Sequence, residues 1–274
     1  MCHHHALSCV AVLALLGLVA GCAQVPRHGV TSASNSAMAY ALDGPPNTPA
    51  VVLQSGLGDG RSTWGGIWPQ LVSKHRVFAI DRPGYGDSPP SARSRDPCQV
   101  ATELREALRE AQVPPPFLLV GHSLGGLYQY AFARLYPQDT AGLLLLDPTN
   151  PAHWATLEKE TPATAAALRG LRATVFTPAM RAEFDDQTVC LDRLETLPQP
   201  TAPSRLLVST RHGALEGEAF RSALQSLRRD WQQRLGSPAI EAVPNSGHYV
   251  HHDAPKLVAQ AIDDMASRGR SASP

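Results

Sequence analysis

Short, uninterrupted apolar runs alternate with helical segments along most of the chain, and this alternation restricts the fold more than any other feature. The runs are residues 49–54, 76–80, 117–120 and 142–146. Continuous apolar runs of this length are typical of strands that are buried on both faces. Residues 100–111 have helical apolar spacing between two prolines. Strands that alternate with helices predict an α/β fold with a mostly parallel central sheet and helices on both faces.

The alternation is interrupted once, in residues 148–203. This stretch has helix-like pieces and scattered prolines but no clear buried strand, so we expect a helical lid inserted into the sheet domain. The pattern then resumes with strands at 204–209 and 239–243 and helices at 218–235 and 254–265.

Length and charge restrict the class of function. At 274 residues the chain is long enough for one large core, and we expect a single domain at 37–268 with a tail at 269–274. Lys plus Arg and Asp plus Glu each number 24, so no net charge attracts nucleic acid. We therefore expect no nucleic-acid partner, and the oligomeric state stays open.

The first residues predict export. Residues 6–20 are apolar and uncharged, too short for a membrane span of about 20 residues, and indicate a signal peptide at 1–21. The following Val-Ala-Gly-Cys resembles the bacterial lipobox and implies lipidation of Cys22, with 22–36 as a tether to the membrane. We therefore expect a lipoprotein of the bacterial cell envelope that faces the periplasm. Cleavage near Ala23, giving a soluble secreted protein, is the alternative.

The five cysteines fit an exported protein. Cys2 and Cys9 lie in the signal peptide and Cys22 would take lipid, which leaves Cys98 and Cys190 in the folded body. Two thiols in an oxidising compartment are consistent with one disulfide. Two separate buried thiols are the alternative, because the sequence does not show their separation.

The sequence Gly-His-Ser-Leu-Gly-Gly at 121–126 carries the chemistry. It follows the apolar run at 117–120 and precedes a helical pattern, which is the context of a G-x-S-x-G nucleophile turn. The turn is sharp and strained, so small residues are needed at 121 and 125. Ser123 is therefore the candidate nucleophile.

With this motif, residues 37–268 resemble the α/β-hydrolase family. Four further segments are similar to landmarks of that family: 54–60, 81–88, 146–148 and 247–248. The resemblance implies a serine hydrolase that cleaves a carboxylic ester or related acyl bond through an acyl-enzyme, without metal or organic cofactor. The expected partner is a small-molecule or lipid ester substrate. Acyltransferase, thioesterase, C–C hydrolase or perhydrolase activity is the alternative. A further alternative is a non-catalytic binding protein on the same scaffold.

A serine nucleophile needs a base, and the base needs a carboxylate. His248 follows the last predicted strand and is the candidate base, whereas His251 and His252 are nearby competitors. We expect His122 to pack or hydrogen-bond under the turn. Asp81 and Arg82 are expected to stabilise a turn.

The acid is ambiguous. Asp147 ends a predicted strand and keeps the order Ser, acid, His. The more usual family position follows the next strand, where Glu216 and Glu218 are the first acids. We favour Asp147 and keep both glutamates as alternatives.

Two backbone amides complete the expected site. An oxyanion requires donors that are already aimed at it. The amide of Leu124, directly after the nucleophile, is one by motif, and the amide of Leu57 is expected to be the other. Ser55 stands where the family usually has a histidine.

Overall fold

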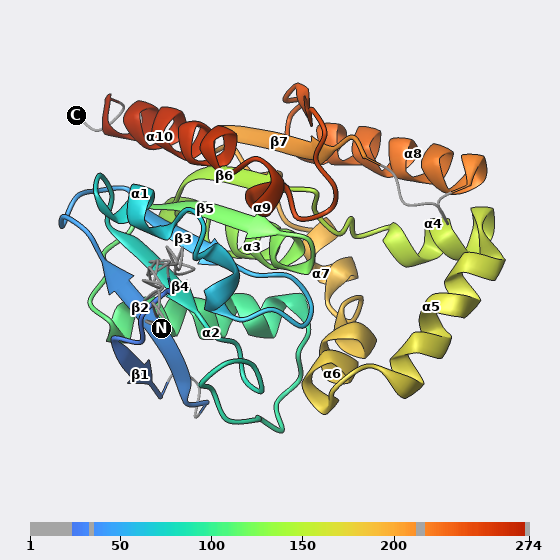
Figure 1. Ribbon diagram of the computed structural model, residues 1–274, viewed down its shortest axis with the longest axis horizontal. Coiled ribbons are helices and arrows are strands. Elements are labelled where there is room, and N and C mark those ends of the chain that lie inside the picture. The colour runs from blue at the N-terminus through green and yellow to red at the C-terminus, as the bar shows by residue number, and fades with distance from the viewer. Residues whose placement is uncertain (1–23, 33–35, 212–216, 272–274) are drawn as a thin grey trace, which may run out of the picture.

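A single eight-stranded sheet organises the part of the chain that the computed structural model describes, residues 24–32, 36–211 and 217–271 (Figure 1). Its strands, in the spatial order β1-β2-β4-β3-β5-β6-β7-β8, are antiparallel at the β1-β2 and β2-β4 pairs and parallel elsewhere. The strands are β1 (Gly29–Thr31), β2 (Met38–Asp43), β3 (Ala50–Gln54), β4 (Val77–Ile80), β5 (Phe117–His122), β6 (Thr140–Leu146), β7 (Ser204–Ser209) and β8 (Ile240–Val243).

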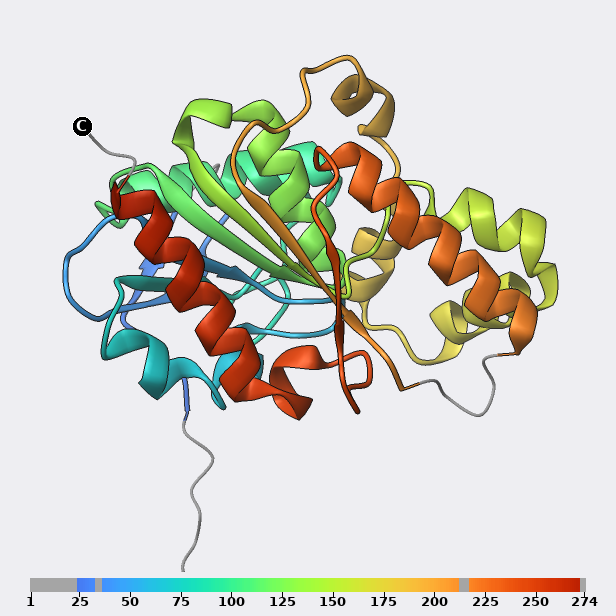
Figure 2. The ribbon, with the colours of Figure 1, turned by 90° about the horizontal axis from the view of Figure 1, so that it is seen from above.

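Helices cover both faces of this sheet, as Figure 2 shows from above. One face packs against α2, α3 and α8, and the other against α1 and α10, and each interface forms its own apolar core. The bounds of these helices are α1 (Trp68–Val72), α2 (Pro97–Glu110), α3 (Leu124–Leu135), α8 (Glu218–Arg234) and α10 (Pro255–Ser271). Both faces of the inner strands are buried, which is why these strands are continuously apolar. The predicted fold class is confirmed.

The amino-terminal edge of the sheet differs from the expectation. Residues 29–31 lie within the predicted tether of 22–36, yet they form β1 and pair with β2. Val25 of the same stretch is buried in the core on the α10 face. At the other end, α10 continues to Ser271, three residues beyond the predicted domain end at 268. The signal peptide of 1–21 and Cys22 lie outside the described residues.

The predicted insertion at 148–203 is helical. It contains α4 (His153–Glu160), α5 (Pro162–Thr174), α6 (Pro178–Asp186) and α7 (Leu191–Glu195), between β6 and β7. In Figure 1 these helices lie beside the sheet, beyond the carboxyl ends of its parallel strands. Cys98 in α2 and Cys190 before α7 form a disulfide, with Cα atoms 6.1 Å apart, so the insertion is joined covalently to the body. In the described chain, no helix has the length and apolar character needed to cross a membrane.

Candidate active site

Ser123 lies at the sharp turn between β5 and α3. Its backbone has φ 52° and ψ −123°, a conformation that residues other than glycine rarely adopt. A Cβ on Gly121 would lie 2.5 Å from the carbonyl oxygen of Gly125, and one on Gly125 would lie 2.2 Å from that of Gln54. Glycine is therefore required at both positions, and the turn brings the start of α3 against the end of β3.

Three side chains form a hydrogen-bonded chain at the carboxyl ends of the strands. Nε2 of His248, in the loop after β8, lies 3.0 Å from Oγ of Ser123. Nδ1 of the same ring lies 2.8 Å from Oδ2 of Asp147, directly after β6. The structure thus brings together the three residues predicted as nucleophile, base and acid. This edge of an open α/β sheet is where such folds build their sites.

Asp147 is held by neighbours that the sequence did not indicate. Its carboxylate accepts hydrogen bonds from the amide and hydroxyl of Ser209, both at 3.1 Å, and lies 3.3 Å from Nη2 of Arg228 in α8. Burial alone would raise the pKa of Asp147, but the hydrogen bonds and charges of His248, Ser209 and Arg228 lower it below its usual value. Asp147 is therefore a carboxylate at neutral pH. Ser209 ends β7, the strand after which the family more usually places the acid.

The alternative acids and bases lie elsewhere. Glu218 is exposed at the first residue of α8 and, among the described residues, forms no hydrogen bond or ion pair with His248. Glu216 lies outside the described residues. His251 is buried with Nε2 3.1 Å from Oγ1 of Thr63, and Nε2 of His252 lies 2.8 Å from the carbonyl oxygen of the same threonine. The ring that hydrogen-bonds to Oγ of Ser123 is that of His248.

His122 supports the loop that carries His248. Its Nε2 lies 2.9 Å from the carbonyl oxygen of His248. Burial and the nearby charge of His248 lower the pKa of His122 to about 3, so the ring is neutral at neutral pH. Because a carbonyl oxygen only accepts hydrogen bonds, Nε2 must carry the proton. His122 thus hydrogen-bonds beneath the turn, as expected.

Leu57 and Leu124, whose amides are the predicted oxyanion donors, both lie at the candidate site. Both residues line the cavity that contains Ser123 and His248. Neither amide nitrogen has an acceptor within the part of the chain that the structure describes. Both amides therefore remain candidates for the two donors that an oxyanion hole requires.

Asp81 and Arg82 organise the loops around this site. Asp81 accepts hydrogen bonds from the amides of Arg61, at 2.6 Å, and of Asp87, at 3.0 Å. Arg82 donates to the carbonyl oxygens of Ser55 and Gly56 at 2.7 and 2.8 Å. Both residues hold turns and neither touches Ser123.

The cavity above Ser123 has a volume of about 330 Å³ and an aromatic wall. Trp154, Phe176 and Phe184 of the insertion form that wall, with ring centroids 4.7 and 5.3 Å apart for the two pairs that include Phe184. A second cavity of about 360 Å³ adjoins it at His153 and His248 and extends toward α8. The insertion therefore supplies three aromatic side chains to the cavity that contains Ser123.

Asp59 is a site residue that the sequence did not single out. It lines the same cavity, and its Oδ2 is buried without a hydrogen-bond partner among the described residues. Burial raises the pKa of Asp59, although the nearby Tyr249 hydroxyl opposes the shift. The only sequence feature that could have indicated Asp59 is its place five residues after β3, in the predicted oxyanion loop.

One group of potential metal ligands occurs in the described chain: Asp96, Cys98 and Cys190. Its two sulfurs are joined in the disulfide, so neither is available as a thiolate ligand. The group lies away from Ser123 and adds no chemistry to the candidate site.

Comparison with known proteins places this geometry in a family. The chain is 28% identical over 217 residues to the uncharacterized protein YqjL of Bacillus subtilis (strain 168), covering 78% of this chain and 82% of YqjL. It is 26% identical over 240 residues to the pimeloyl-[acyl-carrier protein] methyl ester esterase of Edwardsiella ictaluri (strain 93-146), covering 81% and 82%.

A crystal structure of an α/β hydrolase fold protein from Burkholderia ambifaria superposes with a TM-score of 0.63 at 21% identity, covering 88% of this chain and 98% of that one. Residues 51–261 match the family model described as the alpha/beta hydrolase family, which is most of the chain. The predicted resemblance is thereby confirmed: the protein is a member of the alpha/beta hydrolase family.

Proposed function

We propose that this hydrolase cleaves a carboxylic ester or related acyl bond through an acyl-enzyme on Ser123. The observation that carries the proposal is the hydrogen-bonded chain from Ser123 through His248 to Asp147, at 3.0 and 2.8 Å. A serine hydroxyl becomes an effective nucleophile when an adjacent base accepts its proton and a carboxylate orients that base.

The geometry supports a two-step mechanism. Oγ of Ser123 attacks the acyl carbon while Nε2 of His248 takes the proton, and the amides of Leu57 and Leu124 stabilise the oxyanion. The protonated His248 then gives its proton to the departing alcohol. A water molecule, activated by the same nitrogen, releases the acid and restores Ser123.

The cavity favours an apolar group beside the scissile bond. Its wall of Trp154, Phe176 and Phe184 is apolar and aromatic, and such pockets gain affinity by burying apolar surface. An esterase among the relatives is consistent with ester cleavage. Acyl transfer, thioester cleavage and C–C bond cleavage use the same residues, so the identity of the acceptor and of the leaving group distinguishes them.

We also propose that the protein is exported and anchored through a lipidated Cys22. The disulfide between Cys98 and Cys190 supports export, because such bonds persist in oxidising compartments. Mass spectrometry of the mature amino terminus tests this. A diacyl or triacyl modification on Cys22 is expected, and an unmodified terminus downstream of Cys22 would contradict it.

A panel of p-nitrophenyl esters of increasing chain length tests the proposed activity. The parent protein should turn over at least one member, and Ser123→Ala should lower kcat at least 10³-fold, because the variant lacks the nucleophile. The variant should keep the parent circular dichroism spectrum. Activity of Ser123→Ala within tenfold of the parent would exclude Ser123 as the nucleophile.

A further inference from the structure

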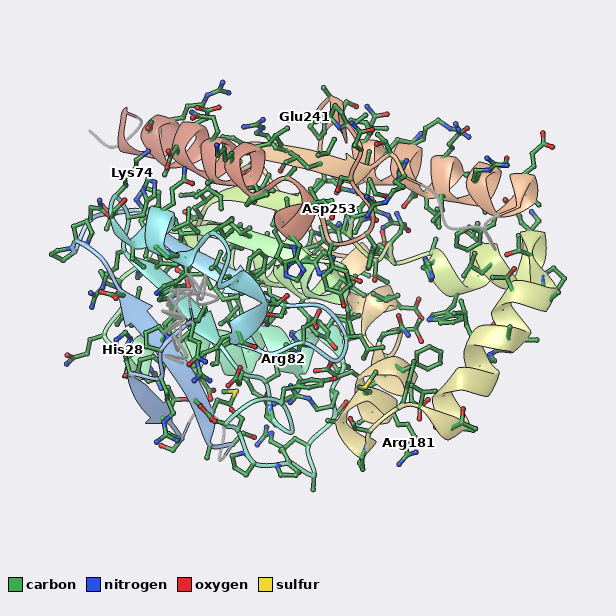
Figure 3. The ribbon with its side chains drawn as sticks, viewed as in Figure 1. His28, Lys74, Arg82, Arg181, Glu241 and Asp253 are labelled. Carbon is green, nitrogen blue, oxygen red and sulfur yellow. A yellow bond between two sulfur atoms is a disulfide. The ribbon has the colours of Figure 1, made fainter. Side chains whose placement is uncertain are left out.

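Arg82 connects the oxyanion loop to the inserted helices. Its guanidinium donates from Nη1 to the carbonyl oxygen of Ser55 at 2.7 Å and from Nη2 to that of Gly56 at 2.8 Å. The same guanidinium meets Glu183 of α6 through Nε at 2.6 Å and Nη2 at 2.9 Å. Arg82 is 2% exposed and Glu183 is 0% exposed, so this is a fully buried, bidentate ion pair (Figure 3 labels Arg82).

The bond to Gly56 fixes the direction of the next amide. In a trans peptide the C=O and the following N–H lie in one plane and point in opposite directions. Because the carbonyl of Gly56 points to Arg82, the N–H of Leu57 points away from Arg82. Leu57 lines the cavity of Ser123 and its amide has no acceptor in the described chain. The hydrogen bond from Arg82 to the carbonyl oxygen of Gly56 therefore determines the direction of the Leu57 N–H.

Helix α6 supports the arrangement at further points. The hydroxyl of Tyr85 donates to Oε2 of Glu183 at 2.9 Å. A Cβ on Gly58, which has φ 85°, would lie 3.3 Å from the methyl carbon of Met180 in α6. The helix thus packs directly on the oxyanion loop. A rigid contact of this kind can hold an amide within the narrow range of directions that oxyanion stabilisation needs.

We propose that Arg82 and Glu183 are positioning residues which aim the Leu57 amide at the oxyanion, so that the inserted segment completes the oxyanion hole. The inference rests on the proposed function, since it assigns a task within that reaction. It also predicts that α6 remains in place during turnover, because its displacement would remove Glu183 from Arg82. Replacing the insertion would then alter kcat as well as substrate choice.

The double variant Arg82→Met/Glu183→Met tests the proposal. Replacing both members of a buried ion pair by apolar side chains usually preserves folding, while both donors to the Ser55 and Gly56 carbonyls are lost. We expect kcat to fall about 100-fold with KM within about threefold, since a misdirected oxyanion donor matters mainly in the transition state. The Ki of a trifluoromethyl ketone, which forms an anionic adduct with serine, should rise by a similar factor.

Arg134→Met is the matched control. Arg134 is also buried, at 3% exposure, and joins α3 to the insertion through the carbonyl oxygens of Leu194 and Leu197, but it touches no atom of the oxyanion loop in the described chain. Its removal should lower stability and leave kcat and the ketone Ki within about threefold. Equal losses in the control and the double variant would show that Arg82 and Glu183 only fasten the insertion.

Arg82→Lys tests the same proposal if the double variant does not fold. Arg82→Lys keeps the charge and the ion pair, but its single nitrogen cannot serve both carbonyls and the carboxylate, so kcat should fall at least tenfold. If the parent turns over esters and the variants keep the parental kcat and ketone Ki, this inference is wrong and the proposed function stands. A parent that turns over no ester would overturn the proposed function and the inference with it.

Discussion

Ser123 and Asp147 both have positive φ angles, of 52° and 42°. Residues held in such sparsely populated conformations cost about 1–3 kcal/mol each and persist where surrounding contacts determine them. The glycines at 121 and 125 permit the first, and the hydrogen bonds from Ser209 support the second. Gln112, Ser237 and Asn245 also have positive φ. Ser123 and Asp147 differ from these three because their side chains hydrogen-bond to His248, so two members of the proposed triad have a strained backbone.

Asp147→Asn should leave a folded protein whose kcat is about 10³- to 10⁴-fold lower. An amide in place of the carboxylate no longer fixes the tautomer of His248 or stabilises its protonated form. Ester turnover and circular dichroism measure the two effects. Glu218→Gln, a change at an exposed position, should keep parental activity. The acid would instead lie in the loop after β7 if Asp147→Asn kept near-parental ester turnover while Glu216→Gln or Glu218→Gln lost it.

His251 should make stability depend on pH. Burial lowers the pKa of His251 to about 2, from 6.5, so between these values the unfolded chain binds a proton that the folded one does not. Stability therefore falls as the pH falls below about 6.5, by up to about 1.4 kcal/mol per pH unit for this residue. Urea unfolding at pH 7.5, 6 and 5 should give a shallower loss for His251→Gln. Parallel curves for the variant and the parent would contradict this.

At the scale of elements, the two ends of the insertion are joined to the body in different ways. The stretch around α6 and α7 is joined to the body by the ion pair of Arg82 with Glu183 and by the disulfide. Helices α4 and α5 pack mainly on each other and on α8. The aromatic wall spans both parts, with Trp154 on α4 and Phe184 on α6.

The disulfide should contribute about 2–4 kcal/mol to the free energy of unfolding, because it closes a long loop in the unfolded chain. Its cysteines are 92 residues apart in sequence. Thermal unfolding with and without a thiol reductant measures this. Reductant should lower the Tm of the parent and leave that of Cys98→Ala/Cys190→Ala unchanged. An unchanged Tm for the reduced parent would refute the contribution.

The parallel strands were predictable because burial on both faces makes each one a continuous apolar run. Both ends of each strand from β3 to β8 lie within two residues of the predicted position. The antiparallel edge was not predicted. β1 has three residues, one of them buried, and a strand this short carries too little periodicity to be recognised without its partner β2.

At the scale of the whole molecule, the site forms where the sheet domain meets the insertion. Ser123 and His248 could be predicted because each belongs to a local motif beside a strand. Asp147 remained ambiguous in the sequence because nothing local distinguishes an acid that orients a histidine from one that caps a loop. The pairing of Arg82 with Glu183 was out of reach, since 101 residues separate them.

Covalent labelling by a fluorophosphonate tests the proposed triad most directly, because the probe reacts with an activated serine and requires no knowledge of the substrate. If the triad activates Ser123, the parent is labelled, peptide mass spectrometry places the adduct on Ser123, and Ser123→Ala and His248→Ala are not labelled. A parent that resists the probe, or an adduct that persists in Ser123→Ala, would contradict the proposed triad.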